Sequence, residues 1–426
     1  MGVGLLAAAT LVALVWANSP WSSHYEALFT TPLRVGFGSL ELVKPLRLWV
    51  NDGLMGIFFF VIGLEIKREL LAGELDSVRK AALPAIAAVG GMVVPAALYI
   101  GAQSGADGVV EGWGVPMATD IAFALGALAI LGSRAPTGLK VFLTALAIVD
   151  DIGAILVIAV AYTDEIALGT LGAGILLLSL AALANRFDVR NALFYFLLGL
   201  LVWLAFLKSG VHATVAALLM ALAIPARTRI DGAGLVQEMS AHLKQLRAIG
   251  LPADTRLNTP EQQQRVTAMG ETVERAEAPL QRLEHALHPL VTYVVLPVFA
   301  LANAGVALGA EGGASVMHPI AIGVALGLVV GKPVGITLFS WIAVKAGVAD
   351  LPAGVGWAHV VGVGALAGVG FTMALFVGSL AFSDDGQVAT SKIAVLAASA
   401  ISCAAGLLIL RFLVPSEPSS EEPAGG

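Results

Sequence analysis

Long apolar runs separated by short polar segments dominate this chain. An α-helix needs about 20 apolar residues to cross the hydrocarbon core of a bilayer, and most of the runs approach or exceed that length. The pattern predicts an all-α polytopic membrane protein with about twelve transmembrane helices. The predicted spans are 3–17, 53–70, 82–101, 114–132, 139–162, 167–184, 191–207, 210–225, 290–309, 318–345, 357–382 and 390–413.

The composition agrees with this class. The 426 residues are 58% hydrophobic and only 13% charged, against about 25% charged in soluble domains. The single cysteine excludes an intrachain disulfide and a thiolate metal cluster. No motif indicates a nucleotide, an organic cofactor or nucleic acid, so the lipid bilayer is the partner that the composition indicates.

The positions of Lys and Arg predict the orientation. Basic residues gather in or beside alternate connections, and such connections are usually cytoplasmic. They are Lys67, Arg68, Arg79, Lys80, Arg134, Lys140, Arg186, Arg190, Arg227 and Arg229. An even number of spans then places both termini in the cytoplasm. Most tryptophans fall at or beside predicted span ends, where amphipathic rings prefer the interface.

Two segments outside the spans have patterns of their own. In the extracytoplasmic loop 18–49, Leu33, Val35 and Phe37 alternate and are followed by Gly38-Ser39, which predicts a small β-hairpin. Residues 226–289 carry acidic and basic residues in equal numbers. They predict a soluble cytoplasmic insert between the first eight spans, within residues 1–225, and the last four, within residues 290–413.

The second half of the insert predicts an amphipathic helix kinked at Pro279. The helix is expected either to lie on the membrane or pack on the bundle, or to be only a helical stretch within a linker. Its apolar positions recur at intervals of three and four, at Val266, Met269, Val273, Ala276, Leu280, Leu283 and Leu287. The last residues, 414–426, are rich in Ser, Glu, Pro and Gly and predict a disordered tail.

The run 139–162 carries two adjacent acids at its centre, Asp150 and Asp151. An acid at the middle of a membrane helix costs about 2.5–3.5 kcal/mol, and such residues usually serve ion or proton pathways. Two neighbouring carboxylates resist being ionised together, and an arriving cation reverses that balance. The pair therefore predicts a site where protons and a metal ion compete. The alternative is an acid pair satisfied within the bundle.

Thr119 and Asp120 follow Pro116 in a second span, a combination that suits a helix interrupted at membrane depth. A glycine-rich weak point, 362–372, lies late in the chain. Interrupted helices at matching places in two halves indicate inverted-topology repeats, with an ion site between two crossing broken helices. A continuous, closely packed glycine-rich helix is the alternative for the second segment.

Three further groups carry charge within or beside spans. Lys332 lies near the middle of its span, where a buried ammonium needs an acid, Asp150 or Asp151, or else neutralises the ends of half-helices. Glu65 and Glu69 share a helix face beside Arg68 at a cytoplasmic helix end, and such a cluster is usually a solvated terminus. His212 is either a pH sensor, because histidine side chains in general titrate near neutral pH, or a simple hydrogen-bonding residue.

Several segments together resemble the NhaA-type bacterial Na+/H+ antiporters. The resemblance runs through nearly the whole chain. Its segments are Ala118–Gly126 (ATDIAFALG), Ala147–Ile155 (AIVDDIGAI), Arg282–Pro289 (RLEHALHP), Gly331–Pro333 (GKP) and Gly370–Met373 (GFTM).

The resemblance implies an inner-membrane antiporter of twelve helices built on two inverted three-helix repeats. It implies that Asp150 and Asp151 carry protons and Na+ or Li+, with Asp151 the main ion ligand, and that Lys332 pairs with Asp150. Thr119 and Asp120 match the helix break. Glu65, Arg68, Glu69 and His212 match positions linked to cytoplasmic access and pH response, and loop 18–49 matches a hairpin used in homodimer contact.

These features together predict a secondary active transporter that exchanges cytoplasmic Na+ or Li+ for external H+ by alternating access, electrogenic and pH-regulated. No resident cofactor is expected. An intramembrane aspartyl protease is disfavoured because its two acids must face each other from separate helices around a water. A Na+-coupled symporter of an organic solute with the same architecture is the main alternative, and a passive cation channel is a weaker one.

Overall fold

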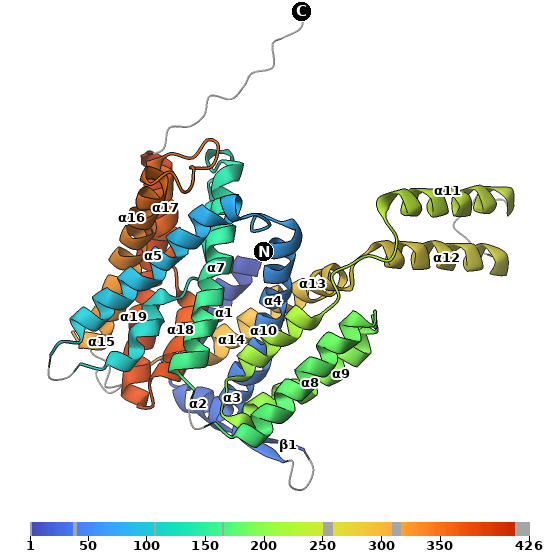
Figure 1. The fold of residues 1–426 in the computed structure, drawn as a ribbon. Coiled ribbons are helices and arrows are strands. Elements are labelled where there is room, and N and C mark those ends of the chain that lie inside the picture. Colours follow the sequence, from blue (N-terminus) through green and yellow to red (C-terminus); the bar gives the residue numbers. More distant parts are fainter. Residues whose placement is uncertain are drawn as a thin grey trace, which may run out of the picture.

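The computed structural model describes residues 2–36, 41–105, 108–163, 166–249, 259–308 and 317–413. Helices make up nearly all of this part and pack side by side as a bundle, from which two helices extend away (Figure 1). The α-helices are α1 (Gly2–Ala17), α2 (Ser22–Thr30), α3 (Leu46–Trp49), α4 (Met55–Ala72), α5 (Val78–Ala102), α6 (Ile121–Ile130), α7 (Thr137–Ala161), α8 (Leu168–Arg186), α9 (Ala192–Ser209), α10 (Ala213–Ala223), α11 (Gly232–Ile249), α12 (Pro260–Ala276), α13 (Pro279–Leu290), α14 (Leu296–Asn303), α15 (Pro319–Leu326), α16 (Lys332–Lys345), α17 (Trp357–Ala367), α18 (Phe371–Ala381) and α19 (Asp385–Phe412).

Shorter elements join these helices. The 3₁₀ segments are η3 (Val110–Met117) and η4 (Gly132–Arg134), and the π-helical turns are η2 (Val50–Leu54), η5 (Val291–Val295) and η7 (Gly327–Gly331). The π turns make continuous rods of α3 with α4, α13 with α14, and α15 with α16. Such turns insert one extra residue into a helix and are common at functional sites.

The polytopic membrane class is confirmed, but the count of twelve spans is not. Within the described residues, nine helices are long and apolar enough to cross a membrane, or eleven if each of two bent pairs is one span. The predicted span 210–225 is α10, which has only 11 residues. It ends where Pro225 forces Ile224 into an extended conformation. The first predicted span is α1, which bends by 112° into α2.

Two three-helix units have the same construction and run in opposite directions. In the first, α5 and α7 flank the broken segment η3–α6; in the second, the rod α15–α16 and α19 flank the broken pair α17–α18. The rods α5 and α16 pack along each other with opposite chain directions (Figure 1). This arrangement confirms the predicted inverted repeats with interrupted middle helices.

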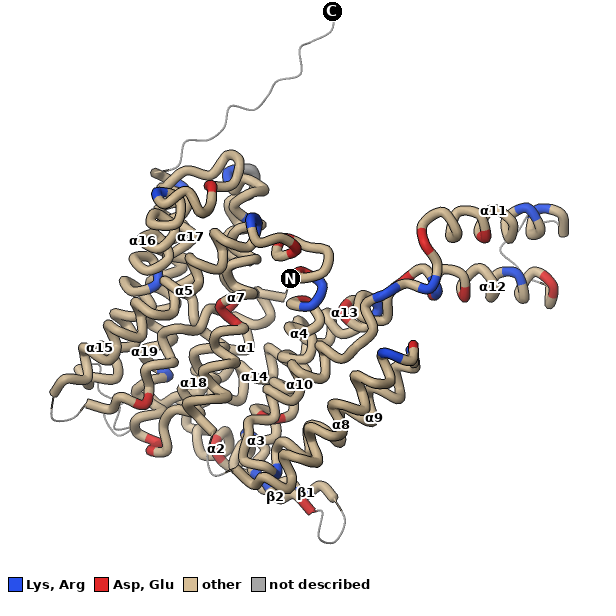
Figure 2. The backbone as a smooth tube through the Cα atoms, in the orientation of Figure 1, with Lys and Arg blue, Asp and Glu red and all other residues tan. Residues whose placement is uncertain are grey.

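Charged residues gather at the two ends of the bundle and along the insert, and most helix centres are free of them (Figure 2). The red segment in the middle of α7 is a clear exception and contains the Asp150–Asp151 pair. The distribution is that expected of helices embedded in hydrocarbon, with a few charges retained for function.

The predicted hairpin is present as β1 (Pro32–Val35) paired antiparallel with β2 (Leu42–Pro45), with Pro32 opposite Pro45 and Val35 opposite Leu42. The Trp49 indole donates to the Leu33 carbonyl at 3.1 Å and stacks near Trp203. These contacts attach the hairpin to the bundle. The predicted turn residues Phe37, Gly38 and Ser39 lie outside the described residues.

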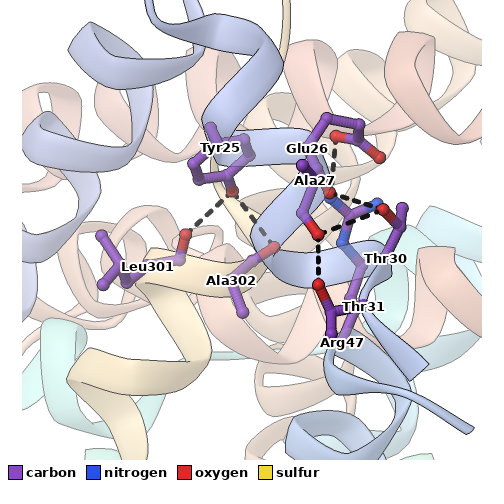
Figure 3. A network of polar contacts seen from close by, with 8 residues as sticks. All are labelled: Tyr25, Glu26, Ala27, Thr30, Thr31, Arg47, Leu301 and Ala302. Atoms are coloured by element: carbon purple, nitrogen blue, oxygen red, sulfur yellow. Dashed lines mark hydrogen bonds and ion pairs between the residues drawn. The ribbon is translucent and has the colours of Figure 1, made fainter. Parts of the chain in front are cut away.

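The helix α2 fixes the end of α14. The Tyr25 hydroxyl donates to the carbonyls of Leu301 at 2.8 Å and Ala302 at 3.1 Å, and beside it Arg47 pairs with Glu26 at 3.0 Å (Figure 3). The last carbonyls of a helix have no partner within the helix, so a buried hydroxyl that reaches them completes the end. The loop 18–49 is therefore integrated into the membrane bundle.

Replacing Tyr25 by Phe tests this attachment. The change leaves the last carbonyls of α14 buried without the hydroxyl, and we expect unfolding to become easier by about 1–3 kcal/mol. Thermal or denaturant unfolding of the purified protein measures the loss. Tyr293→Phe is the matched control, because Tyr293 is 49% exposed. An equal loss in the two variants would contradict the role of the Tyr25 hydroxyl.

The insert differs from its prediction in two ways. Its first half also forms a helix, α11, and the predicted kinked helix is two separate helices, α12 and α13. The reason is Pro279, which stands in the first turn of α13, where its missing N–H costs nothing, and therefore starts a helix instead of kinking one. The helices α11 and α12 pair through Glu238 and Arg275, 2.6 Å apart. The predicted tail 414–426 lies outside the described residues.

Candidate functional site

The two broken helices meet at their breaks. Between η3 and α6 the residues Ala118 and Asp120 are extended, and the break between α17 and α18 falls at Gly368–Gly370. The Asp120 amide donates to the Val369 carbonyl at 2.7 Å. The Thr119 hydroxyl donates to the Ala367 carbonyl at 2.9 Å. Each broken helix thereby provides hydrogen-bond partners for backbone groups that the break in the other helix leaves unpaired, as burial in a membrane requires.

Glycine permits this close approach. A Cβ at Gly368 would collide with the Leu328 carbonyl oxygen of η7, and a Cβ at Gly370 would be pressed against the Ala118 carbonyl. Substitution at Gly368 would therefore force the broken helix away from its neighbour. The glycine-rich segment 362–372 is an interrupted helix as predicted, and its glycines serve both packing and the break.

Asp120 neutralises the positive ends of both α6 and α18. Its carboxylate accepts from the Phe123 amide at 3.0 Å, and from the Thr372 amide at 3.1 Å and hydroxyl at 2.5 Å. The exposed N–H groups at a helix start carry a partial positive charge that an acid stabilises. Since these bonds occupy the carboxylate, Asp120 is suited to hold the crossing together. The sequence pattern did not indicate Thr372 as the partner of Asp120, although it lies in the segment GFTM.

Lys332, at the start of α16, meets this crossing from the other side. Its ammonium donates to Asp150 at 2.5 Å and to the Thr119 hydroxyl at 2.8 Å. The side chain of Lys332 is fully buried, and that of Asp150 is 1% exposed. The ion pair expected for a buried lysine is thus formed with Asp150. It joins α7, α16 and the break before α6 in one polar cluster.

Asp151 lies beside this pair and is used differently. It is 1% exposed, and its Oδ2 has no hydrogen-bond partner within the described residues; the same holds for Oδ1 of Asp150. Buried carboxylate oxygens without partners are costly and call for a ligand or a proton. Carboxylate oxygens are also the donors that hard cations prefer. The arrangement can therefore hold one cation, with Asp151 free to accept it.

The charges of the cluster make the binding of a proton and the binding of a cation mutually exclusive. Two ionised carboxylates and one ammonium leave a net negative charge, which one monovalent cation or one proton cancels. If a cation binds both carboxylates, it weakens the hold of Asp150 on Lys332 because the two positive charges repel each other at short range. The chemistry that this cluster offers is reversible binding and displacement of a cation or a proton.

Glu65, Arg68 and Glu69 form a second cluster at the end of α4. Arg68 reaches Glu69 at 3.0 Å and Glu65 at 4.0 Å, and its Nε lies 3.2 Å from Glu284 of α13. Glu284 was not assigned a role from the sequence, although it lies in the segment Arg282–Pro289. The cluster therefore joins the end of α4 to the start of the rod α13–α14.

His212 is not part of that cluster. It precedes α10, and its Nε2 lies 2.8 Å from the Tyr162 carbonyl at the end of α7. The opposite end of α10 is held at the other cluster, where Lys67 donates to the Leu222 carbonyl at 2.7 Å. His212 lines a cavity of about 600 Å³ together with Glu111, Tyr162 and Ser383. The four residues for which the resemblance implies a pH response thus lie at opposite ends of α10 and α4 and do not form one group.

Comparison with known proteins identifies the family. The family model for Na+/H+ antiporter 1 matches residues 1–410. The chain belongs to this antiporter family. Relatives called Na+/H+ antiporter NhaA support the assignment. That of Oleidesulfovibrio alaskensis is 50% identical over 96% of this chain and 91% of its own length. Those of Koribacter versatilis and Acidithiobacillus ferrooxidans are each 47% identical over 95% of this chain, and over 88% and 93% of their own.

The family match covers both polar clusters and the insert. It places the chain among transporters of the membrane. The antiporter names of the relatives give no support to the hypothesis of a Na+-coupled organic-solute symporter.

Proposed function

We propose that this chain exchanges cytoplasmic Na+ or Li+ for external H+ by alternating access, electrogenically and under pH control. The observation that carries the proposal is the Lys332–Asp150 ion pair beside Asp151, whose buried Oδ2 has no partner in the described chain. The site lies where two broken helices cross, the usual place for the coupling ion in transporters built from inverted repeats.

The proposed cycle follows from charge balance. Na+ reaches ionised Asp151 from the cytoplasm, binds Asp150 as well and takes the place of the Lys332 ammonium. The loaded site opens outward, where protons displace the cation and the ion pair forms again. Two carboxylates, or one carboxylate and the lysine, can supply more than one proton for each cation, and exchange in that ratio is electrogenic.

The orientation and assembly belong to the same proposal. The basic residues at alternate connections support cytoplasmic termini in the bacterial inner membrane, with α11 and α12 in the cytoplasm. The hairpin β1–β2 supports a homodimer through loop 18–49, since its short strands present edges with unpaired backbone groups that a second copy can pair.

Proteoliposomes with a trapped pH dye test the function directly. NaCl or LiCl added to the purified protein should produce a dye response, and choline chloride should not. The absence of a dye response at every pH from mildly acidic to alkaline, in correctly inserted protein, would contradict the antiport proposal. Uptake of labelled organic solutes driven by Na+ would point to symport.

Arg68→Gln tests the pH response. Without the guanidinium, the carboxylates of Glu65, Glu69 and Glu284 repel one another and bind protons more tightly. If release of these protons activates exchange, the activity profile should move to higher pH by about one unit. The assay is the Na+-driven dye response measured across pH.

The matched control is Arg282→Gln, because Arg282 pairs at 2.8 Å with Glu274 outside the cluster. Its profile should stay within a few tenths of a unit of the unmodified protein. An unmoved profile in Arg68→Gln, or a move to lower pH, would remove the cluster from the pH response.

A further inference from the structure

A groove separate from the ion site runs between α16 and α17. It has a volume of about 490 Å³ and is lined by Pro333, Leu338 and Trp341 of α16 and by Trp357 and Val361 of α17. Leu338 and Trp341 are 43% and 44% exposed. Both helices belong to membrane spans, so these exposed apolar side chains face the acyl chains of the bilayer.

The helix α16, which forms one wall of the groove, is about as long as one leaflet is thick. α16 has 14 residues, which at 1.5 Å per residue span roughly 20 Å. Its first residue is Lys332 of the buried ion site, and its last is Lys345, which is exposed. One half of a hydrocarbon core about 30 Å thick lies between such positions. A single acyl chain lying in the groove therefore reaches from the surface to the depth of the ion site.

The surface end of the groove carries a free positive charge. The Lys345 ammonium lies 4.5 Å from the centre of the Trp341 ring, a cation–π contact that holds it at the mouth. Within the described chain, no carboxylate forms an ion pair with Lys345. Arg411 lies in the last turn of α19, which packs on α17.

We propose that this groove is a binding site for an anionic phospholipid of the cytoplasmic leaflet. One acyl chain lies between α16 and α17, and the headgroup phosphate pairs with Lys345. A lysine at an anionic membrane surface contributes about 1 kcal/mol, so the charge selects anionic over zwitterionic lipids. The choice of leaflet rests on the orientation in the proposed function.

The site adjoins the ion-binding machinery. Pro333 lines the groove directly after Lys332, and a Cβ at Gly364 of α17 would lie 3.0 Å from the Pro333 Cα, so the two backbones are in close contact there. A chain in the groove packs against both helices behind the Lys332–Asp150 pair. The bound lipid thus supports the position of Lys332.

Thermal unfolding of the full-length protein in detergent tests the proposal. Phosphatidylglycerol, phosphatidylcholine with the same acyl chains and inorganic phosphate are titrated separately. We expect phosphatidylglycerol to stabilise the protein at lower concentration than phosphatidylcholine, and phosphate to have no effect. In Lys345→Gln the apparent affinity for phosphatidylglycerol should fall about fivefold, the factor for one lysine. Lys208→Gln, an exposed lysine in the last turn of α9, is the matched control and should bind as the unmodified protein does.

Filling the groove distinguishes a bound chain from a bound headgroup. Val361→Trp should abolish the preference for phosphatidylglycerol although Lys345 remains. If that variant does not fold, Leu338→Trp fills the groove from its exposed side. Equal stabilisation by the two lipids, an unchanged affinity in Lys345→Gln, or stabilisation by phosphate alone would overturn the proposal. Unfolding does not depend on ion exchange, so the lipid proposal and the transport proposal are tested independently of each other.

Discussion

Asp151→Asn should reduce the Na+- or Li+-driven dye response in proteoliposomes to that of empty liposomes. The amide has the shape of the carboxylate but cannot carry the charge that balances the cation or exchange the proton. The structure makes this a clean test, because Asp151 is 1% exposed and forms no ion pair with any described residue. Folding should survive, since a buried amide costs less than a buried charge.

Asp76→Asn is the matched control for this variant. Asp76 makes an ordinary surface pair with Lys80 at 3.1 Å, and its loss should leave the response unchanged. Unfolding curves of both variants show whether each is folded. A full response in folded Asp151→Asn would remove this residue from the ion path and leave Asp150 as the remaining acid of the pair to be tested.

Lys332→Gln should have the largest effect on stability. The substitution leaves Asp150 as a buried carboxylate without its counter-charge, and loss of one member of a buried ion pair typically costs about 3–5 kcal/mol. The loss should be greatest at alkaline pH, where Asp150 remains ionised, and smaller in acid, where a proton replaces the ammonium. Thermal or denaturant unfolding across pH measures both effects.

The double variant Asp150→Asn/Lys332→Gln provides the control. It removes both charges and keeps the shapes of the side chains, so it should recover much of the stability lost in Lys332→Gln and show little dependence on pH. If the double variant is no more stable than Lys332→Gln, the cost comes from packing around the lysine stem and not from the uncompensated charge of Asp150.

These two variants separate the roles of adjacent acids. Asp150 belongs to an ion pair that holds α7 to α16, whereas Asp151 has a buried oxygen without a hydrogen-bond partner in the described residues. In the proposed cycle, Na+ bound at Asp151 also binds Asp150 and weakens its ion pair with Lys332. Binding then loosens the contact between α7 and α16, which the proposed alternating access requires to move.

The sequence was informative wherever a single element carries the signal. A long apolar run specifies a membrane helix because backbone polar groups in lipid must be hydrogen-bonded within the protein, and a single segment achieves this only as a helix. The cost of burying charge indicated the acids at the centre of α7 and the lysine at mid-depth as candidate functional residues. The alternation in loop 18–49 predicted a small hairpin, and the structure has one with strands at 32–35 and 42–45, because a hairpin is a local structure.

Helix lengths and breaks were harder to predict from the sequence. The pattern could not show that α10 is only 11 residues long, or that Pro279 begins a helix instead of kinking one. Hydropathy is averaged along the chain, whereas a helix end depends on a few backbone conformations around Pro and Gly. The π turns that join three of the rods likewise leave no signal in the pattern of apolar residues.

The sequence by itself determined a polytopic membrane protein, its family, its buried charges and the requirement that Lys332 find an acid. The tertiary structure alone decided which acid: the crossing of two broken helices brings Thr119 and Asp150 to the lysine and leaves Asp151 beside them. It also joined Glu284 to Arg68 across more than two hundred residues of chain. Spacing along one helix fixes which side chains share a face, but contacts between distant helices depend on how the whole bundle packs, and that packing is a property of all the helices together.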